Sequence, residues 1–260
     1  MQHSAVYNLW FAAAVCVVCA VVVSASAVSL KDRQAVNAAL DKQRNVLLAA
    51  GLANDSEKLS REEIEERFVP IRQIAVDLET GEENPDVDPA TFDYRRAAFD
   101  PDTSRPAPDN PSRVQRLADY AVVYQLQDDA GTIQTLILPV EGYGLWGTLY
   151  GFLALDADLN TVRGLTFYDH KETPGLGGEV DNPTWKARWA GRLAFDDELN
   201  PTITVIKGPA RPPAEEPHEV DGLSGATLTS RGVTNLIHFW LGENGFGPYL
   251  NRLRQNEGVI

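Results

Sequence analysis

The sequence predicts an α+β fold: an antiparallel sheet packed with helices, preceded by a single N-terminal transmembrane helix. Two observations predict the sheet, a series of apolar strand-like segments between residues 120 and 168 and the short polar turns that separate them. Short turns join antiparallel neighbours, whereas parallel strands need long crossover connections. An uncharged apolar run near the N-terminus predicts the membrane helix.

The composition sets limits on the partners of the protein. The chain has 260 residues, and its hydrophobic content of 43% is enough for a substantial core. The formal net charge is -14 and the pI is near 4.7. Because affinity for nucleic acids depends on clustered Lys and Arg, no nucleic acid is expected as a partner.

The apolar run is expected to anchor the protein in a membrane. It extends from Leu9 to Val28, and the first charged residue is Lys31. About 20 residues at ~1.5 Å per residue cross a hydrocarbon core of ~30 Å. A cleaved signal peptide is the alternative, since Ala25-Ser26-Ala27 resembles a cleavage site. The length of the run and the lack of Lys or Arg before it favour a retained anchor, formed with its flank by residues 1–34.

The charges that flank the anchor give a weak orientation signal. No Lys or Arg precedes the span, whereas Lys31, Arg33, Lys42 and Arg44 follow it. The positive-inside rule, taken alone, therefore places the large domain in the cytoplasm.

Residues 35–112 are expected to be helical and irregular. Helix-forming residues with a loose amphipathic stripe run from Leu30 to Leu52. Ser60-Arg-Glu-Glu63 is a capping box that opens a second helix, which Pro70 interrupts. The acidic, proline-rich stretch Glu79–Ser112 predicts a long irregular connection.

Residues 113–260 are expected to form the α+β domain itself. Strands are predicted at Tyr120–Leu126, Ile133–Val140, Leu149–Leu155, Val162–Tyr168 and Thr202–Ile206. Asp128-Asp-Ala-Gly131 is a hairpin signal between the first two of them. Helices are predicted at Thr184–Trp189, Leu228–Trp240 and Tyr249–Gln255.

Gly142-Tyr-Gly-Leu-Trp-Gly147 matches the glycine pattern of dinucleotide-binding folds. That pattern must open a helix inside a βαβ unit. Here β-branched, aromatic and apolar residues follow, so a strand is expected instead. The stretch predicts a glycine-rich bend that presents Tyr143 and Trp146, and Trp146 either packs in the core or contacts a ligand ring.

The stretch Tyr168-Asp-His-Lys-Glu-Thr-Pro-Gly-Leu-Gly-Gly178 predicts a constrained loop after a strand. Its proline and glycines allow its backbone and Leu176 to approach a flat ligand closely. His170 and Glu172 lack a third ligand at a suitable spacing, so no metal site is expected. Local hydrogen bonds are expected to hold the loop.

Asp221-Gly-Leu-Ser-Gly-Ala-Thr-Leu-Thr-Ser-Arg-Gly232 gathers four hydroxyl side chains just before and within a predicted helix start. No base accompanies them, so no catalytic nucleophile is expected. Free amides and the helix dipole favour an anion such as phosphate at this position. The alternative is that Ser224 or Thr227 only caps the helix.

Three stretches resemble a known family. The pattern Asp221-x-x-Ser-Gly-Ala-Thr227-x-Thr229 resembles the flavinylation motif of the FMN-binding family, and His170-x-Glu-Thr-Pro-Gly-Leu-Gly177 resembles its second signature. The stretch from Lys31 to Asn45 is similar to the C subunits of Na+-translocating NADH:quinone oxidoreductases.

The resemblance implies FMN joined through its phosphate to Thr227 by a separate flavin transferase, which explains the missing base. Asp221 is then part of what the transferase recognises, and the other hydroxyls cap the helix or lie near the phosphate. The motif residues around the attachment point are implied to be Ser224, Gly225, Ala226, Leu228 and Thr229. The ring is implied to contact Trp146, Glu172, Thr173 and Leu176, with Lys207 balancing charge.

The resemblance further implies a subunit that relays electrons one at a time through FMN and has no substrate site of its own. Its partners would be the other subunits of the membrane NADH:quinone oxidoreductase complex. It would lie in the bacterial inner membrane with its large domain on the periplasmic side, which overrides the charge count. An Rnf-type flavin subunit and an anchored sensory module without covalent cofactor are the alternatives.

Overall fold

A computed structural model describes residues 4–257, which divide into two compact units between Lys42 and Gln43. Helix α1 spans Ala5–Ala49, so the expected anchor and the helical segment after it form one continuous element. Within the described part of the chain, α1 is the one helix long and apolar enough to cross a membrane. The predicted fold class is confirmed.

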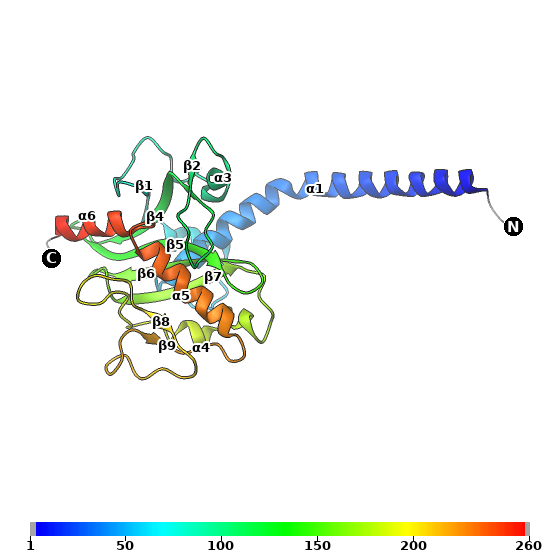
Figure 1. Cartoon of the computed structure of the whole chain (residues 1–260). Coiled ribbons are helices and arrows are strands. Elements are labelled where there is room, and N and C mark those ends of the chain that lie inside the picture. The colour runs from blue at the N-terminus through cyan, green and yellow to red at the C-terminus, as the bar shows by residue number, and fades with distance from the viewer. Residues whose placement is uncertain (1–3, 258–260) are drawn as a thin grey trace. The chain divides into compact units, whose positions relative to one another are not determined.

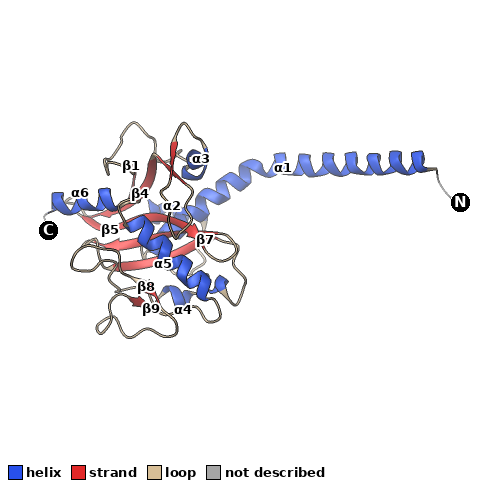
Figure 2. Cartoon of the chain, viewed as in Figure 1, coloured by secondary structure: helices blue, strands red, loops and turns tan. Residues whose placement is uncertain are grey.

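A five-stranded antiparallel sheet forms the centre of the second unit, in the order β1-β4-β5-β6-β7 (Figure 2). Its strands are β1 (Ile71–Asp77), β4 (Tyr120–Gln127), β5 (Ile133–Tyr143), β6 (Thr148–Asp156) and β7 (Val162–Asp169). The last four match the predicted strands. The pattern of β1 is broken by Arg72 and Gln73, which is why the sequence did not predict this strand; it pairs with β4 along its whole length.

Helices cover both faces of this sheet. On one face α5 (Thr227–Leu241) packs against β5, where the missing side chain of Gly142 lets Leu236 approach (Figure 1). Phe152 belongs to the opposite face and contacts Tyr124 with ring centroids 5.7 Å apart. On that face the last turn of α1 lies so close to β7 that a Cβ on Gly164 would be 2.6 Å from the Ala49 carbonyl oxygen.

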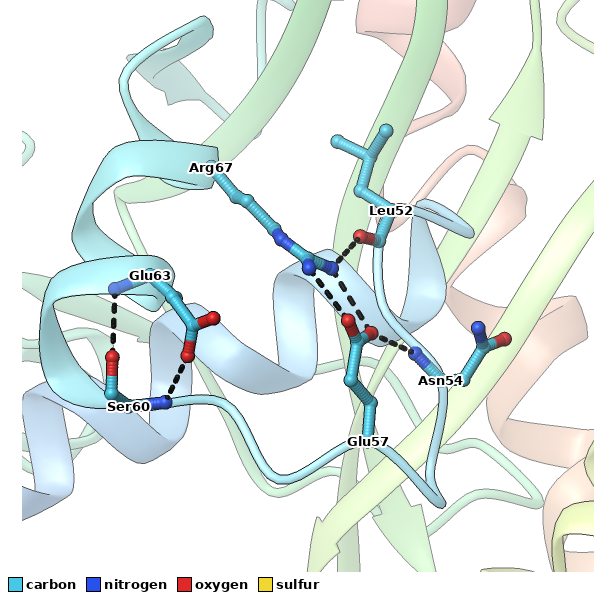
Figure 3. Close-up of polar contacts among 6 residues, drawn as sticks. All are labelled: Leu52, Asn54, Glu57, Ser60, Glu63 and Arg67. Carbon is cyan, nitrogen blue, oxygen red and sulfur yellow. Dashed lines mark hydrogen bonds and ion pairs between the residues drawn. The ribbon is translucent and has the colours of Figure 1, made fainter.

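Helix α2 (Arg61–Phe68) begins as the sequence predicts. The Ser60 hydroxyl accepts from the Glu63 amide at 3.2 Å, and the Glu63 carboxylate accepts from the Ser60 amide at 2.7 Å. Next to this capping box Arg67 donates to both carboxylate oxygens of Glu57, at 3.0 and 2.6 Å (Figure 3). These contacts join α2 to the loop after α1.

The remaining elements are short. The connection 79–112 is irregular as predicted, apart from α3 (Tyr94–Phe99) and β2 (Ser104–Pro106), which pairs with β3 (Arg116–Ala118). After β7 come a 3-10 turn η1 (Gly177–Asp181), α4 (Pro183–Lys186) and a parallel pair, β8 (Thr204–Val205) with β9 (Glu219–Val220). Helix α6 (Gly247–Glu257) follows α5. The predicted helix at residues 184–189 and the predicted strand at residues 202–206 are therefore shorter than expected.

The glycine-rich stretch 142–147 is the turn of the β5–β6 hairpin. Tyr143 pairs with Thr148, and the Gly144 amide donates to the Gly147 carbonyl at 2.8 Å. A strand follows this turn, so the prediction against a dinucleotide-binding βαβ unit is confirmed.

Candidate functional site

Glu172 joins the three segments that the sequence singled out. Its side chain is buried, with the residue 5% exposed. One carboxylate oxygen accepts from the amides of Leu145 and Trp146, each at 2.9 Å, and the other accepts from the Thr229 hydroxyl at 2.6 Å. The hairpin turn, the loop after β7 and the first turn of α5 therefore meet at one side chain.

The glycines of two motifs are required by this meeting point. A Cβ on Gly144 would lie 2.6 Å from one Glu172 carboxylate oxygen. A Cβ on Gly177 would lie 2.5 Å from the other oxygen and 2.5 Å from the Thr229 hydroxyl. Real Cβ atoms do not tolerate such distances, so only glycine fits at these positions without a shift of the site.

The start of α5 corrects the expectation that hydroxyls cap this helix. Its N-cap residue is Ala226, and none of the described side chains forms a cap hydrogen bond. Thr229 is directed to Glu172, and the Ser230 hydroxyl accepts from the Leu223 amide in the preceding loop. The reason is the backbone path: a Gly225 with φ of +71° places Ala226, which has no hydroxyl, at the cap. The first-turn amides are left for another acceptor.

Three exposed apolar side chains lie on the segments that meet at Glu172, and one of them follows the exposed Thr227 directly in the chain. Trp146 is 63% exposed, Leu176 45% and Leu228 52%. They come from different segments, and Leu176 lies over Gly225, since a Cβ there would be 3.0 Å from a Leu176 methyl. Large apolar side chains that gather at a surface mark a binding area. We call Trp146, Leu176 and Leu228 the apolar rim.

A cleft of about 690 Å³ opens beside Thr227. Lys207 lines it, which brings together two residues that the sequence predicted for one site. Arg231 also lines it and was not singled out from the sequence. The sequence signal that could have found Arg231 is its spacing from Thr227, because residues four apart lie on one face of a helix. The cleft therefore places two basic side chains near an exposed threonine at a helix start.

Asp221 shapes the wall of this cleft. One carboxylate oxygen accepts from the Ala210 amide at 3.0 Å, and the other lies 3.7 Å from the Arg188 guanidinium. Its carbonyl accepts from the Trp185 indole at 2.8 Å. These contacts hold the start of the hydroxyl-rich motif, and recognition of Asp221 by a transferase stays a prediction.

Local hydrogen bonds hold the loop after β7, as the sequence predicts. A His170 ring nitrogen lies 2.7 Å from the Asp181 carboxylate, and the other accepts from the Glu172 amide at 3.1 Å. The carbonyl of the exposed Thr173 accepts from the amides of Leu176 and Gly178. The loop thus has a defined shape that presents Leu176 outward.

The comparisons with known proteins first define the class. Residues 144–242 match the family model of the FMN-binding domain, a range that includes the hairpin turn, Glu172 and α5. This part of the chain is an FMN-binding domain.

Relatives that match over nearly the whole chain then define the family. The chain is 48% identical over 260 residues to the C subunit of the Na(+)-translocating NADH-quinone reductase of Pseudomonas aeruginosa, covering 98% of each chain. It is 48% identical to the corresponding C subunit of Yersinia pestis, covering 92% of this chain and 90% of the relative. The crystal structure of Shewanella oneidensis NqrC matches with a TM-score of 0.76 and 34% identity, over 83% of this chain and 97% of that one. The chain belongs to the NqrC family, the C subunits of Na+-translocating NADH-quinone reductases.

Proposed function

We propose that this chain is the membrane-anchored flavin subunit of a Na+-translocating NADH-quinone reductase, with FMN joined through its phosphate to Thr227. The observation that carries the proposal is the setting of Thr227. It is exposed, it is the first residue of an α5 without a side-chain cap, it lines the cleft, and it directly precedes Leu228 of the apolar rim. Bound there, FMN supplies one-electron transfer between the redox centres of partner subunits.

The residues present fit a phosphodiester at Thr227. The first-turn amides of α5 and the helix dipole favour a negative charge at this end of the helix. Lys207 and Arg231 line the adjacent cleft and offset the same charge from the side. Exposed Ser224 and Gly225 leave the threonine hydroxyl accessible to a separate flavin transferase, which supplies the activation that this chain lacks.

The apolar rim fits a flat aromatic ring system. Trp146, Leu176 and Leu228 offer apolar surface next to the attachment point, and Thr173 is exposed on the same loop as Leu176. Glu172 lies beneath this surface with both carboxylate oxygens hydrogen-bonded. We therefore assign the ring contacts to the rim and Thr173, and a supporting role to Glu172.

The anchor and the partners follow from the family. Helix α1 holds the subunit in the bacterial inner membrane, and the other subunits of the complex are its partners. We place the folded unit on the periplasmic side because the flavin transferase of this family works there, although the flanking Lys and Arg favour the opposite side. The alternatives of an Rnf-type subunit and a sensory module are disfavoured by the closely similar relatives and by the FMN-binding domain.

The test is a denaturing gel of full-length protein co-expressed with a flavin transferase. Yellow-green fluorescence is expected to migrate with the wild-type band, and the intact mass should rise by FMN less water. Thr227→Ala should abolish both signals. Thr184→Ala, which changes another exposed threonine in the first turn of a helix, should keep them. A dark wild-type band in cells with active transferase contradicts the proposal, as does a fluorescent Thr227→Ala band.

A further inference from the structure

We infer that Glu172 is a positioning residue of the flavin site. Its buried carboxylate fixes the turn that carries Trp146 and the helix turn that carries Thr227 in one arrangement, and its charge sets the reduction potential of the flavin attached there. The inference rests on the proposed function, because it concerns the surroundings of a flavin on Thr227.

The first support is the reach of the side chain. The three donors to Glu172 are Leu145, Trp146 and Thr229, which lie 27, 26 and 57 residues away from it in the chain. Each donor belongs to the apolar rim or precedes or follows a rim residue directly. A displacement of this one carboxylate therefore moves the supports of Trp146 and Leu228 together.

The second support is the kind of donor. Both amides and the hydroxyl are neutral groups, and among the ion pairs of residues 4–257 none includes Glu172. Three donated hydrogen bonds suit a carboxylate, which is acceptor-only when ionised. Its charge is therefore stabilised in place without being neutralised by a basic side chain.

The third support is the lack of space for another arrangement. A Cβ on Gly144 or on Gly177 would clash with the Glu172 carboxylate itself. Close by, a Cβ on Gly232 of α5 would lie 2.5 Å from the Tyr143 carbonyl oxygen, so the helix and the hairpin are also in direct contact. Close packing at both points leaves the carboxylate one position.

The consequence concerns electron uptake. A negative charge in a site shielded from water raises the free energy of adding an electron to a neighbouring group. Glu172 is therefore expected to lower the reduction potential of the attached flavin. Replacing the carboxylate by an amide removes the charge and also one of the acceptor atoms, since the amide nitrogen is a donor.

The experiment uses the full-length chain, co-expressed with a flavin transferase and purified in detergent. Flavin content per protein and the midpoint potential of the attached flavin are measured for wild type and Glu172→Gln. The variant is expected to bind less flavin. Its attached flavin should be easier to reduce by about tenfold in the equilibrium constant, or about 30 mV for a two-electron couple.

Variants of the hydroxyl partner test the same contact without changing the charge. Thr229→Val removes the donor and should lower the flavin content several-fold, whereas Thr229→Ser keeps a hydroxyl and should restore it. The matched control is Thr166→Val, because Thr166 is a buried threonine whose hydroxyl bonds to Asn45 on the opposite face of the sheet. This control should match wild type in both measurements.

Wild-type flavin content and potential in both Glu172→Gln and Thr229→Val would overturn the inference. If Glu172→Gln does not accumulate in cells, the inference is tested with Thr229→Val and Thr229→Ser. Equal flavin content in these two variants would contradict it. Failure of the proposed function looks different, since covalent flavin would then be absent from wild type or would persist in Thr227→Ala.

Discussion

Two regions of this protein use a carboxylate to hold loops together, with different results. Near α2, Glu57 accepts from the two terminal guanidinium nitrogens of Arg67, Nη1 and Nη2, and from the Asn54 amide at 3.4 Å (Figure 3). In the proposed flavin site Glu172 also accepts three hydrogen bonds. The Glu57 side chain is 33% exposed and its partners lie within 10 residues of it in the chain, whereas Glu172 is buried and joins distant segments.

The difference shows how burial changes the structural effect of a carboxylate that accepts three hydrogen bonds. An exposed carboxylate competes with water for its partners, so the contacts near α2 organise a surface loop at small gain. A buried carboxylate cannot replace a lost partner by water. Losing a hydrogen-bond donor therefore leaves the desolvation penalty of the carboxylate uncompensated. For this reason the buried contact fixes geometry, and substitutions in the buried region should have larger effects than substitutions near α2.

Gly177→Ala should break the buried region most severely. The new methyl group would meet the Glu172 carboxylate and the Thr229 hydroxyl at 2.5 Å. Overpacking of this kind costs about 1–3 kcal/mol, and covalent flavin should be lost at the same time. Urea unfolding and in-gel fluorescence of the full-length protein measure the two effects. Gly175→Ala in the same loop is the control, because no atom lies within 4 Å of its Cβ position, although its φ of +75° adds backbone strain. Equal flavin loss in both variants would contradict this interpretation.

Glu141→Gln should show the effect of burial on a carboxylate separately from the effect of hydrogen bonding. Glu141 lies on β5 beside a cavity of about 320 Å³ that Arg95 also lines. Burial raises the pKa of this carboxyl from its ordinary 4.5 to about 7, against the opposing effect of Arg95. Among the residues described, no side chain or amide donates to it, in contrast to Glu172.

The sign of the pH effect follows from that raised pKa. Between pH 4.5 and pH 7 the folded chain keeps a proton that the unfolded chain releases, so the free energy of unfolding falls as the pH rises. Gln cannot ionise, so the variant should be more stable than wild type by about 1–3 kcal/mol at pH 8 and equal to it near pH 4.5. Urea midpoints at both pH values test this. A variant with the same pH slope as wild type refutes it.

Ser60→Ala should have the smallest effect and leave the flavin untouched. The change removes the hydroxyl that accepts from the Glu63 amide at the start of α2, which costs about 1 kcal/mol. Thermal unfolding measures the loss, and in-gel fluorescence should equal that of wild type. Asp93→Ala, which removes the side-chain cap of α3, gives a second surface cap for comparison. Reduced flavin content in Ser60→Ala would mean that the two regions are coupled.

Local signals were sufficient for much of the fold. Local patterns predict three kinds of element, because each depends on neighbours in the chain. They are the membrane-length run, the capping box at Ser60 and the strands β4 to β7. Strand β1 was missed because a short run with Arg72 and Gln73 becomes a strand only through pairing with β4. Likewise, the hydroxyls of the Thr227 motif were expected as caps because capping is a local rule.

By itself the sequence determined the family, the antiparallel architecture and the membrane-length apolar helix, and it predicted a set of residues for a site around Thr227. Only the tertiary structure decided what those residues do for one another: Ala226 at the helix start, Arg231 in the cleft, and Glu172 as the shared acceptor of three segments. The physical reason is that burial and hydrogen-bond partners belong to the packed chain. Nothing in the sequence indicates that residues 145, 172 and 229 are in contact, and only close packing of the folded chain brings them within hydrogen-bonding distance.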